Sequence, residues 1–178
     1  MPLSRSRVFR RKPWRTGSLR GDFLVAERVV VVTERSLVTF RDAAKAHEGM
    51  AFWGGVETPN GVLIMSAVIP ACEHSEGRVH CSELVVRDVA RALRDDGLGI
   101  LAQIHSHGTD DARHSEGDDS LVLMPFEGML SIVVPRYGRY GMRPLEGCGI
   151  HQFQDGEWIL CTSGLEKLKV VRSCVDLR

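Results

Sequence analysis

Two histidines, a serine and an aspartate occupy one short stretch of the chain at a spacing that suits a catalytic zinc ion. His105 and His107 follow an apolar run at 99–104 that predicts a buried strand. Alternate residues of a strand point to the same face, so both imidazoles are expected to reach one metal ion. Ser115 and Asp118 lie three residues apart after a polar connector, and they share one face if a helix begins there. Two histidines and one carboxylate leave the fourth tetrahedral position for water, which is the arrangement of catalytic zinc sites and not of structural ones.

The chain before this stretch predicts alternating strands and helices that would position it. Asn60-Gly61 is a strong hairpin signal between two apolar segments. The expected elements are a strand at 28–32, a helix capped by Thr33 and ending near 47–49, strands at 50–57 and 62–69, and, after a polar stretch at 72–80, a helix capped by Ser82 and stopped at Gly97.

The chain after this stretch predicts further strands. Beyond a turn at Ser115–Asp118, a short helix is expected until Met124-Pro125, followed by a strand at 129–134 and a hairpin of 147–153 with 157–160. This order fits an α/β fold in which helices cover a mixed sheet.

Length and composition indicate one globular domain. The chain has 178 residues, enough for a hydrophobic core without disulfide bonds, and it shows no internal repeat or linker. No apolar stretch approaches the roughly 20 residues that cross a bilayer, so we expect no membrane association.

The positive charge is concentrated at the N-terminus. Residues 1–20 carry seven Lys or Arg and no acid, whereas the rest of the chain has a net charge of minus seven. We therefore divide the chain into a basic, flexible tail at 1–22 and a domain at 23–178. The tail could be a solvated terminus, a partner-docking strand, a mitochondrial presequence or a nucleic-acid arm, although nucleic acid is not the expected partner.

The cysteines and the N-terminus predict a cytoplasmic protein. The five cysteines are scattered and form no Cys-x-x-Cys pair, so we expect reduced thiols. No apolar signal-peptide core follows the basic residues, which argues against secretion.

The full pattern is His-x-His, seven residues, then Ser-x-x-Asp, and it resembles the JAB/MPN (JAMM) metalloprotease motif of the Mov34/MPN/PAD-1 family. The resemblance covers roughly residues 28–160. It implies a single α/β domain with a mixed, curved β-sheet flanked by helices, layered as in cytidine deaminases. Gly108 departs from the family, in which many members have proline after the second histidine.

The family also carries a glutamate upstream, in a segment of the form Glu-x-x-Gly-Leu-x-x-Gly. The segment 48–55 offers Glu48 at its start and Gly55 at its end, with Ala51 in place of the first glycine. Glu57 is a rival, but it lacks the glycine seven positions later. Glu48 is therefore the expected catalytic glutamate.

The resemblance implies metal ligands at His105, His107 and Asp118. Asp119 is an alternative ligand that does not satisfy the spacing. The remaining polar residues of the connector are expected to be solvated and not to bind metal: Asp110, Asp111 and His114.

The resemblance also implies the roles of the site residues. Bound Zn²⁺ lowers the pKa of its water to about 7. Glu48 would take the proton of that water and pass it to the departing amine, and Ser115 would donate a hydrogen bond to the oxyanion.

The implied reaction is hydrolysis of an isopeptide or peptide bond at the C-terminus of a ubiquitin-like protein, as in bacterial members that act beside activating and conjugating enzymes. Such a C-terminal tail could add to a strand edge, and the stretch 72–80 is either a wall of that groove or a plain surface loop. The alternative function is a non-catalytic MPN-type scaffold. A metallo-β-lactamase centre is excluded, because it requires Asp and His at the next alternate positions after His-x-His, where this chain has Thr109 and Asp110.

Overall fold

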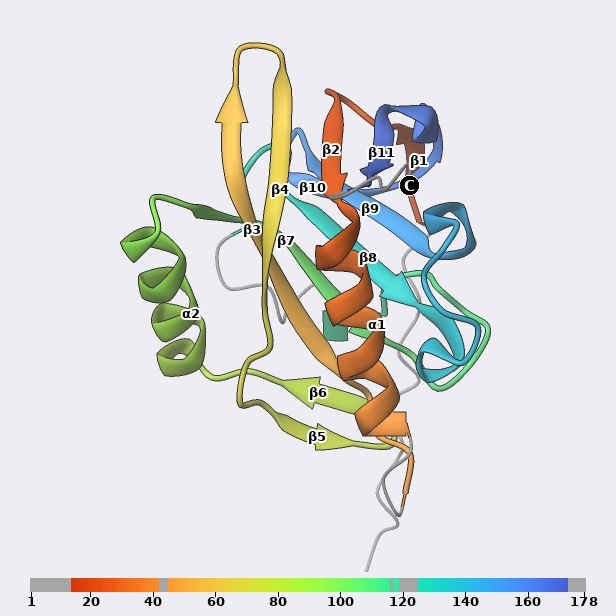
Figure 1. The fold of residues 1–178 in the computed structure, drawn as a ribbon. Helices are drawn as coiled ribbons and strands as arrows, with labels where there is room; N and C mark the ends of the chain where they lie inside the picture. The colour runs from red at the N-terminus through yellow and green to blue at the C-terminus, as the bar shows by residue number, and fades with distance from the viewer. Residues whose placement is uncertain (1–13, 42–44, 116, 119–124, 173–178) are drawn as a thin grey trace, which may run out of the picture.

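The computed structural model describes residues 14–41, 45–115, 117–118 and 125–172. Within them, nine strands form one curled mixed sheet (Figure 1). The strands are β1 (Thr16–Ser18), β2 (Phe23–Ala26), β3 (Met50–Thr58), β4 (Gly61–Val68), β7 (Gly99–Ser106), β8 (Leu130–Val134), β9 (Gly149–Gln154), β10 (Glu157–Ser163) and β11 (Leu168–Val171). Their spatial order is β1-β10-β9-β8-β7-β3-β4-β2-β11. The helices are α1 (Glu27–Arg41) and α2 (Glu83–Asp95), and a separate hairpin pairs β5 (Glu73–Ser75) with β6 (Arg78–His80).

The two helices cover opposite faces of the sheet. Along β3, Ala51 and Trp53 belong to the main core, in which α1 lies, whereas Met50 and Phe52 belong to a second core with Leu93 of α2. This is the alternation expected of a strand buried on both faces. The predicted α/β class, with a curved mixed sheet flanked by helices, is confirmed. Within the described residues, neither helix has the length and apolar composition needed to cross a bilayer.

The strand predicted at 28–32 is wrong, because these residues form the first turns of α1. Val29, Thr33 and Leu37 are buried at helical spacing, and this burial outweighs the local β preference of consecutive valines. Thr33 is therefore inside the helix and not its cap. Its hydroxyl donates to the Val29 carbonyl at 2.9 Å and accepts from the Trp53 indole at 2.8 Å. The helix is described as far as Arg41, and residues 45–49 are not helical, so it ends earlier than predicted.

The predictions around the central strands are confirmed. β3 and β4 form the predicted hairpin, in which Pro59 and Asn60 make the turn and Gly61 pairs with Thr58. The Ser82 hydroxyl caps α2 by accepting from the Val85 amide. Gly97 has a φ of +74°, as a glycine that ends a helix often does. The strands predicted at 99–104 and 129–134 are β7 and β8, and β9 pairs with β10 as predicted. The short strands β1, β2, β5, β6 and β11 were not predicted. Residues 117 and 118 are helical, whereas the short helix predicted beyond Asp118 falls on residues 119–124, which lie outside the described residues.

The predicted tail boundary at 22 and 23 is also wrong, because part of the basic segment belongs to the sheet. β1 pairs in parallel with β10, and Leu19 is buried in the main core. The Arg20 amide donates to the Gln152 side chain at 2.8 Å. The three-residue strand has no hydrophobic alternation, so only its backbone pairing identifies it. Residues 1–13 lie outside the described part of the chain.

The prediction of reduced thiols is wrong for one pair. Cys72 and Cys81 form a disulfide, because the β5–β6 hairpin returns the chain on itself and brings their Cα atoms within 4.6 Å. That separation lies in the usual range for disulfides. The pairing depends on a hairpin that the polar sequence did not predict. Cys174 lies outside the described residues.

Candidate metal centre

The end of β7 presents the two histidines side by side. Ile104 faces the main core, so alternation turns His105 to the other face, where it pairs in register with Val133 of the parallel strand β8. His107 follows the last residue of β7. Its amide donates to the Val134 carbonyl at 2.9 Å, and its carbonyl accepts from the Tyr137 amide at 2.7 Å. Backbone hydrogen bonds therefore fix His107 although it lies beyond the strand.

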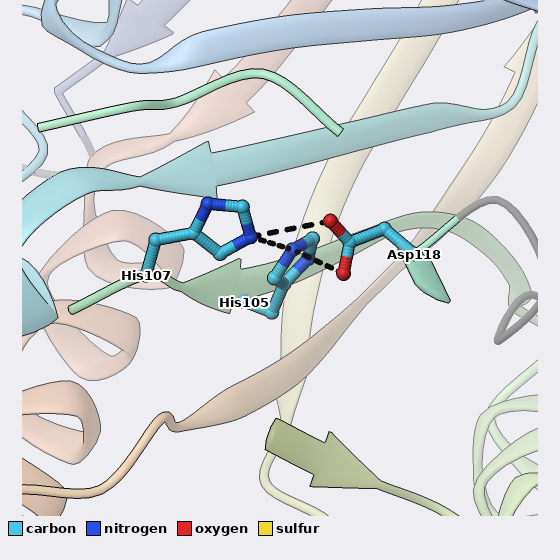
Figure 2. A group of neighbouring side chains, drawn as sticks. All are labelled: His105, His107 and Asp118. Atoms are coloured by element: carbon cyan, nitrogen blue, oxygen red, sulfur yellow. Dashed lines mark hydrogen bonds and ion pairs between the residues drawn. The ribbon is translucent and has the colours of Figure 1, made fainter. Parts of the chain in front are cut away.

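Asp118 completes a group of three converging ligands. The Nε2 atoms of His105 and His107 lie 3.1 Å apart. The Asp118 carboxylate lies 3.3 Å from the His105 Nε2 and 3.2 Å from the His107 Nε2, and it faces both rings in Figure 2. Tetrahedral ligands bonded to zinc at 2.0–2.1 Å are separated by about 3.3 Å. The three atoms thus fit one such ion in number, chemical type and spacing.

Hydrogen bonds orient the ligands. The His107 Nδ1 lies 2.8 Å from the Asp111 carbonyl and must donate to it, which makes Nε2 the ring atom that would bind a metal once it is deprotonated. The Ser115 amide donates to the Asp118 carboxylate, and the Asp118 amide donates to the Ser115 hydroxyl at 3.2 Å. This reciprocal pair is an N-terminal cap that aims the carboxylate at the histidines.

The pKa shifts of Asp118 and His105 favour the protonation states that bind a metal, an ionised carboxylate and a neutral imidazole, whereas the shift of His107 does not. Burial opposes ionisation of Asp118, but hydrogen bonds from His105 and His107 hold the pKa of the carboxyl well below its usual range. Burial also lowers the pKa of His105, which keeps its ring neutral. At His107, the effect of burial is outweighed by Asp118 and the Asp111 carbonyl, so its pKa is raised. A divalent cation must displace that proton, so metal binding at this site is expected to weaken in acid.

Glu48 lies beside this group at the start of β3. Its side chain is almost buried, and its carboxylate accepts a hydrogen bond from the Gly108 amide, next to His107. Burial, reinforced by the Asp118 charge, raises the pKa of Glu48 to about 7, although His107 and the Gly108 amide act in the opposite direction. A carboxyl with such a pKa can accept and release a proton near neutral pH. The rival Glu57 is exposed near the far end of β3, which at about 3.3 Å per residue lies roughly 30 Å away.

Ser115 is exposed next to the ligand group. Its oxygen accepts from the Asp118 amide, which leaves its hydroxyl proton to be donated elsewhere. The structure thus brings all five predicted site residues to the same end of the sheet.

His114 was predicted to be a solvated residue of the connector, and this prediction is wrong because its side chain is buried. Its ring stacks on His151 with centroids 3.9 Å apart, and its Nε2 lies 2.8 Å from the Ser131 hydroxyl. The same hydroxyl accepts from Gln103 at 3.0 Å. Burial lowers the pKa of His151 to about 2. These residues form a buried polar layer behind His105, and their signal in the sequence is a polar residue within each of three neighbouring strands, Gln103 in β7, Ser131 in β8 and His151 in β9.

Tyr137 is a neighbour of the site that the sequence pattern did not indicate. Arg136 and Tyr137 both adopt the left-handed conformation, with φ of 50° and 52°, which is uncommon outside glycine and costs energy. Their amides donate to the carbonyls of Thr109 and His107, so the strained turn holds the chain just after His107. The Tyr137 ring lies where a side chain at Gly108 would point.

Comparison with known proteins decides the family. Residues 31–146 match the family model described as prokaryotic homologs of the JAB domain. The chain belongs to this family. The match spans the segment that carries Glu48 and the whole His105–Asp118 stretch.

Individual relatives agree with this membership. A Sinorhizobium fredii (strain NBRC 101917 / NGR234) protein, named probable metalloprotease y4jG, is 40% identical over 101 residues, which cover 53% of this chain. The chain matches only 60% of that relative's length. Among solved structures, one from Desulfitobacterium hafniense has a TM-score of 0.58 at 13% identity and covers 85% of this chain and 95% of its own. One from Salinibacter ruber has a TM-score of 0.53 at 18% identity, with coverage of 83% and 90%. At these identities, the solved structures support the fold alone.

Proposed function

We propose that this protein is a zinc-dependent peptidase that cleaves an isopeptide or peptide bond at the C-terminus of a ubiquitin-like protein. The observation that carries the proposal is the convergence of His105, His107 and Asp118 at zinc-ligand spacing beside the buried carboxyl of Glu48. Membership of the JAB family and the relative named as a probable metalloprotease support metal-dependent hydrolysis.

The proposed chemistry divides between the metal and the chain. Bound zinc would supply an activated water with a pKa near 7 and polarise the scissile carbonyl. Glu48 accepts the proton of the attacking water and then delivers it to the departing amine. A pKa of about 7 suits both steps, and such proton transfer contributes about 10²- to 10⁴-fold. Ser115 donates a hydrogen bond from its hydroxyl to the developing oxyanion, a contribution typically worth about 3 kcal/mol.

The proposed substrate is an extended C-terminal tail, because such a tail can pair with a strand edge. The stretch 72–80 was expected to be a groove wall or a plain loop, and it contains the β5–β6 hairpin, which offers such an edge next to Glu48. The proposed partners are the ubiquitin-like protein or its conjugate and the activating and conjugating enzymes of its pathway. The cytoplasm remains the predicted location on the argument from the N-terminal sequence alone, because the Cys72–Cys81 disulfide removes the argument from reduced thiols.

Site-directed variants at the two candidate glutamates test the proposal. We expect the zinc-loaded protein to release a reporter fused behind the Gly-Gly end of a ubiquitin-like protein, assayed over a panel of such fusions. Glu48→Gln should lower kcat at least 10²-fold while zinc content is unchanged, and the matched variant Glu57→Gln should retain full activity. Zinc binding without cleavage of any fusion would favour a non-catalytic scaffold, and full activity of Glu48→Gln would refute the assigned role.

A further inference from the structure

The β5–β6 hairpin holds the backbone of Glu48 on both sides of the residue. The Glu48 amide donates to the Ser75 carbonyl at 2.9 Å. The Glu48 carbonyl lies 2.7 Å from the His74 Nδ1, and because a carbonyl only accepts, the imidazole must be the donor. In Figure 1 the hairpin lies near the start of β3 and close to the end of α1.

His74 is itself fixed by packing. Its ring contacts Phe40 of α1 with centroids 4.2 Å apart. The Phe40 carbonyl accepts from the amide of His47, the residue before Glu48. The imidazole therefore links α1 to the segment that carries the catalytic glutamate.

The hairpin is anchored at its base and at its turn. The Cys72–Cys81 disulfide closes its base, where the Cys81 sulfur lies 3.5 Å from the sulfur of Met50. At the turn, the Tyr137 hydroxyl donates to the Glu76 carbonyl at 2.6 Å. Tyr137 also binds the backbone of His107, so the hairpin is connected to both the metal ligand and the glutamate.

We propose that His74 is a positioning residue for Glu48, acting through its Nδ1–H hydrogen bond to the Glu48 carbonyl. The inference rests on the proposed role of Glu48 and extends it to a residue outside the metal-binding motif. The His74 bond and the Ser75 bond together fix the peptide groups on either side of the Glu48 Cα, and hence the origin of its side chain. A misplacement of about 1 Å can cost roughly 10²-fold in rate, so a bond remote from the metal can control turnover.

Three variants separate the hydrogen bond from the packing. His74→Phe keeps a ring against Phe40 but removes the donor. His74→Asn restores a donor at the position of Nδ1. His80→Phe is the matched control, because it makes the same change in the same hairpin at a residue whose buried Nδ1 has no hydrogen-bond partner among the described residues.

The first measurement is steady-state kinetics of the zinc-loaded protein. We expect His74→Phe to lower kcat at least tenfold, with KM within about threefold of wild type and zinc content unchanged. His74→Asn should recover most of kcat, and His80→Phe should match wild type. An unchanged kcat in His74→Phe, or an equal loss in His80→Phe, would overturn the proposal.

The second measurement needs no activity. Hydrogen exchange of the Glu48 amide, whose acceptor is in the hairpin, should accelerate about fivefold in His74→Phe, as expected for loss of one hydrogen bond of about 1 kcal/mol. The rate should return towards wild type in His74→Asn. Unchanged exchange refutes the positioning role even if the protein is a peptidase, whereas faster exchange in a protein that cleaves nothing refutes the proposed function and leaves His74 as a support for Glu48.

Discussion

The buried His151 should make the stability of the metal-free fold depend on pH in a calculable way. Its pKa is about 2 in the folded protein against about 6.5 when unfolded, so only the unfolded chain binds a proton between these values. Stability is therefore lost as the pH falls below about 6.5, at up to about 1.4 kcal/mol per pH unit. Between pH 7 and pH 5 the loss from this one residue is about 2 kcal/mol.

A variant isolates this contribution from the other histidines. His151→Gln removes the titration, and its amide oxygen can still accept from the His114 amide, which donates to the His151 Nε2 at 3.2 Å. Urea denaturation of the chelator-treated proteins at the two pH values gives the free energy of unfolding of each. Wild type should lose about 2 kcal/mol more than the variant over this interval. Equal losses would show that His151 is not held neutral in the fold, and would refute the reasoning from burial.

Two further predictions test the corrected domain boundary and the disulfide. Leu19→Ala should lower the free energy of unfolding by about 2–5 kcal/mol, because Leu19 is buried in the main core. A loss under about 0.5 kcal/mol in denaturant titration would show that Leu19 belongs to a flexible tail and not to the core. Replacing Cys72 and Cys81 by serine should cost about 3 kcal/mol, the chain-entropy value for a loop closed across a sequence separation of nine residues. Thermal unfolding with and without reductant checks this prediction, since reduction should destabilise wild type and leave the double variant unchanged.

The sequence predicted the central fold because its signals there were local. Asn60-Gly61 marks the hairpin, although its two-residue turn is Pro59-Asn60 and Gly61 is the first residue of β4. Ser82 and Gly97 mark the ends of α2 whatever surrounds them. The valines at the start of α1 were misassigned because their local preference is for strands, and only the core contacts of Val29 and Leu37 select the helix. Edge strands such as β1 and β11 are too short to show alternation.

The residues of the candidate site were predicted from the sequence, but the contacts that support them were not. His105 and His107 follow from strand alternation, and the family pattern indicated Ser115, Asp118 and the distant Glu48. Contacts made only by the tertiary fold were not predictable, since the sequence gives no sign that His74 reaches the Glu48 backbone or that Tyr137 lies against Gly108.

The central claim is that His105, His107 and Asp118 bind one zinc ion next to Glu48. Anomalous diffraction at the zinc edge from crystals grown with zinc tests it most directly. We expect one peak at about 2.0–2.1 Å from the Nε2 atoms of both histidines and about 2.0–2.2 Å from an Asp118 carboxylate oxygen, with Glu48 outside bonding distance. A protein crystallised with zinc that shows no ion at these three atoms, or one bound by Glu48 in place of Asp118, would contradict the account.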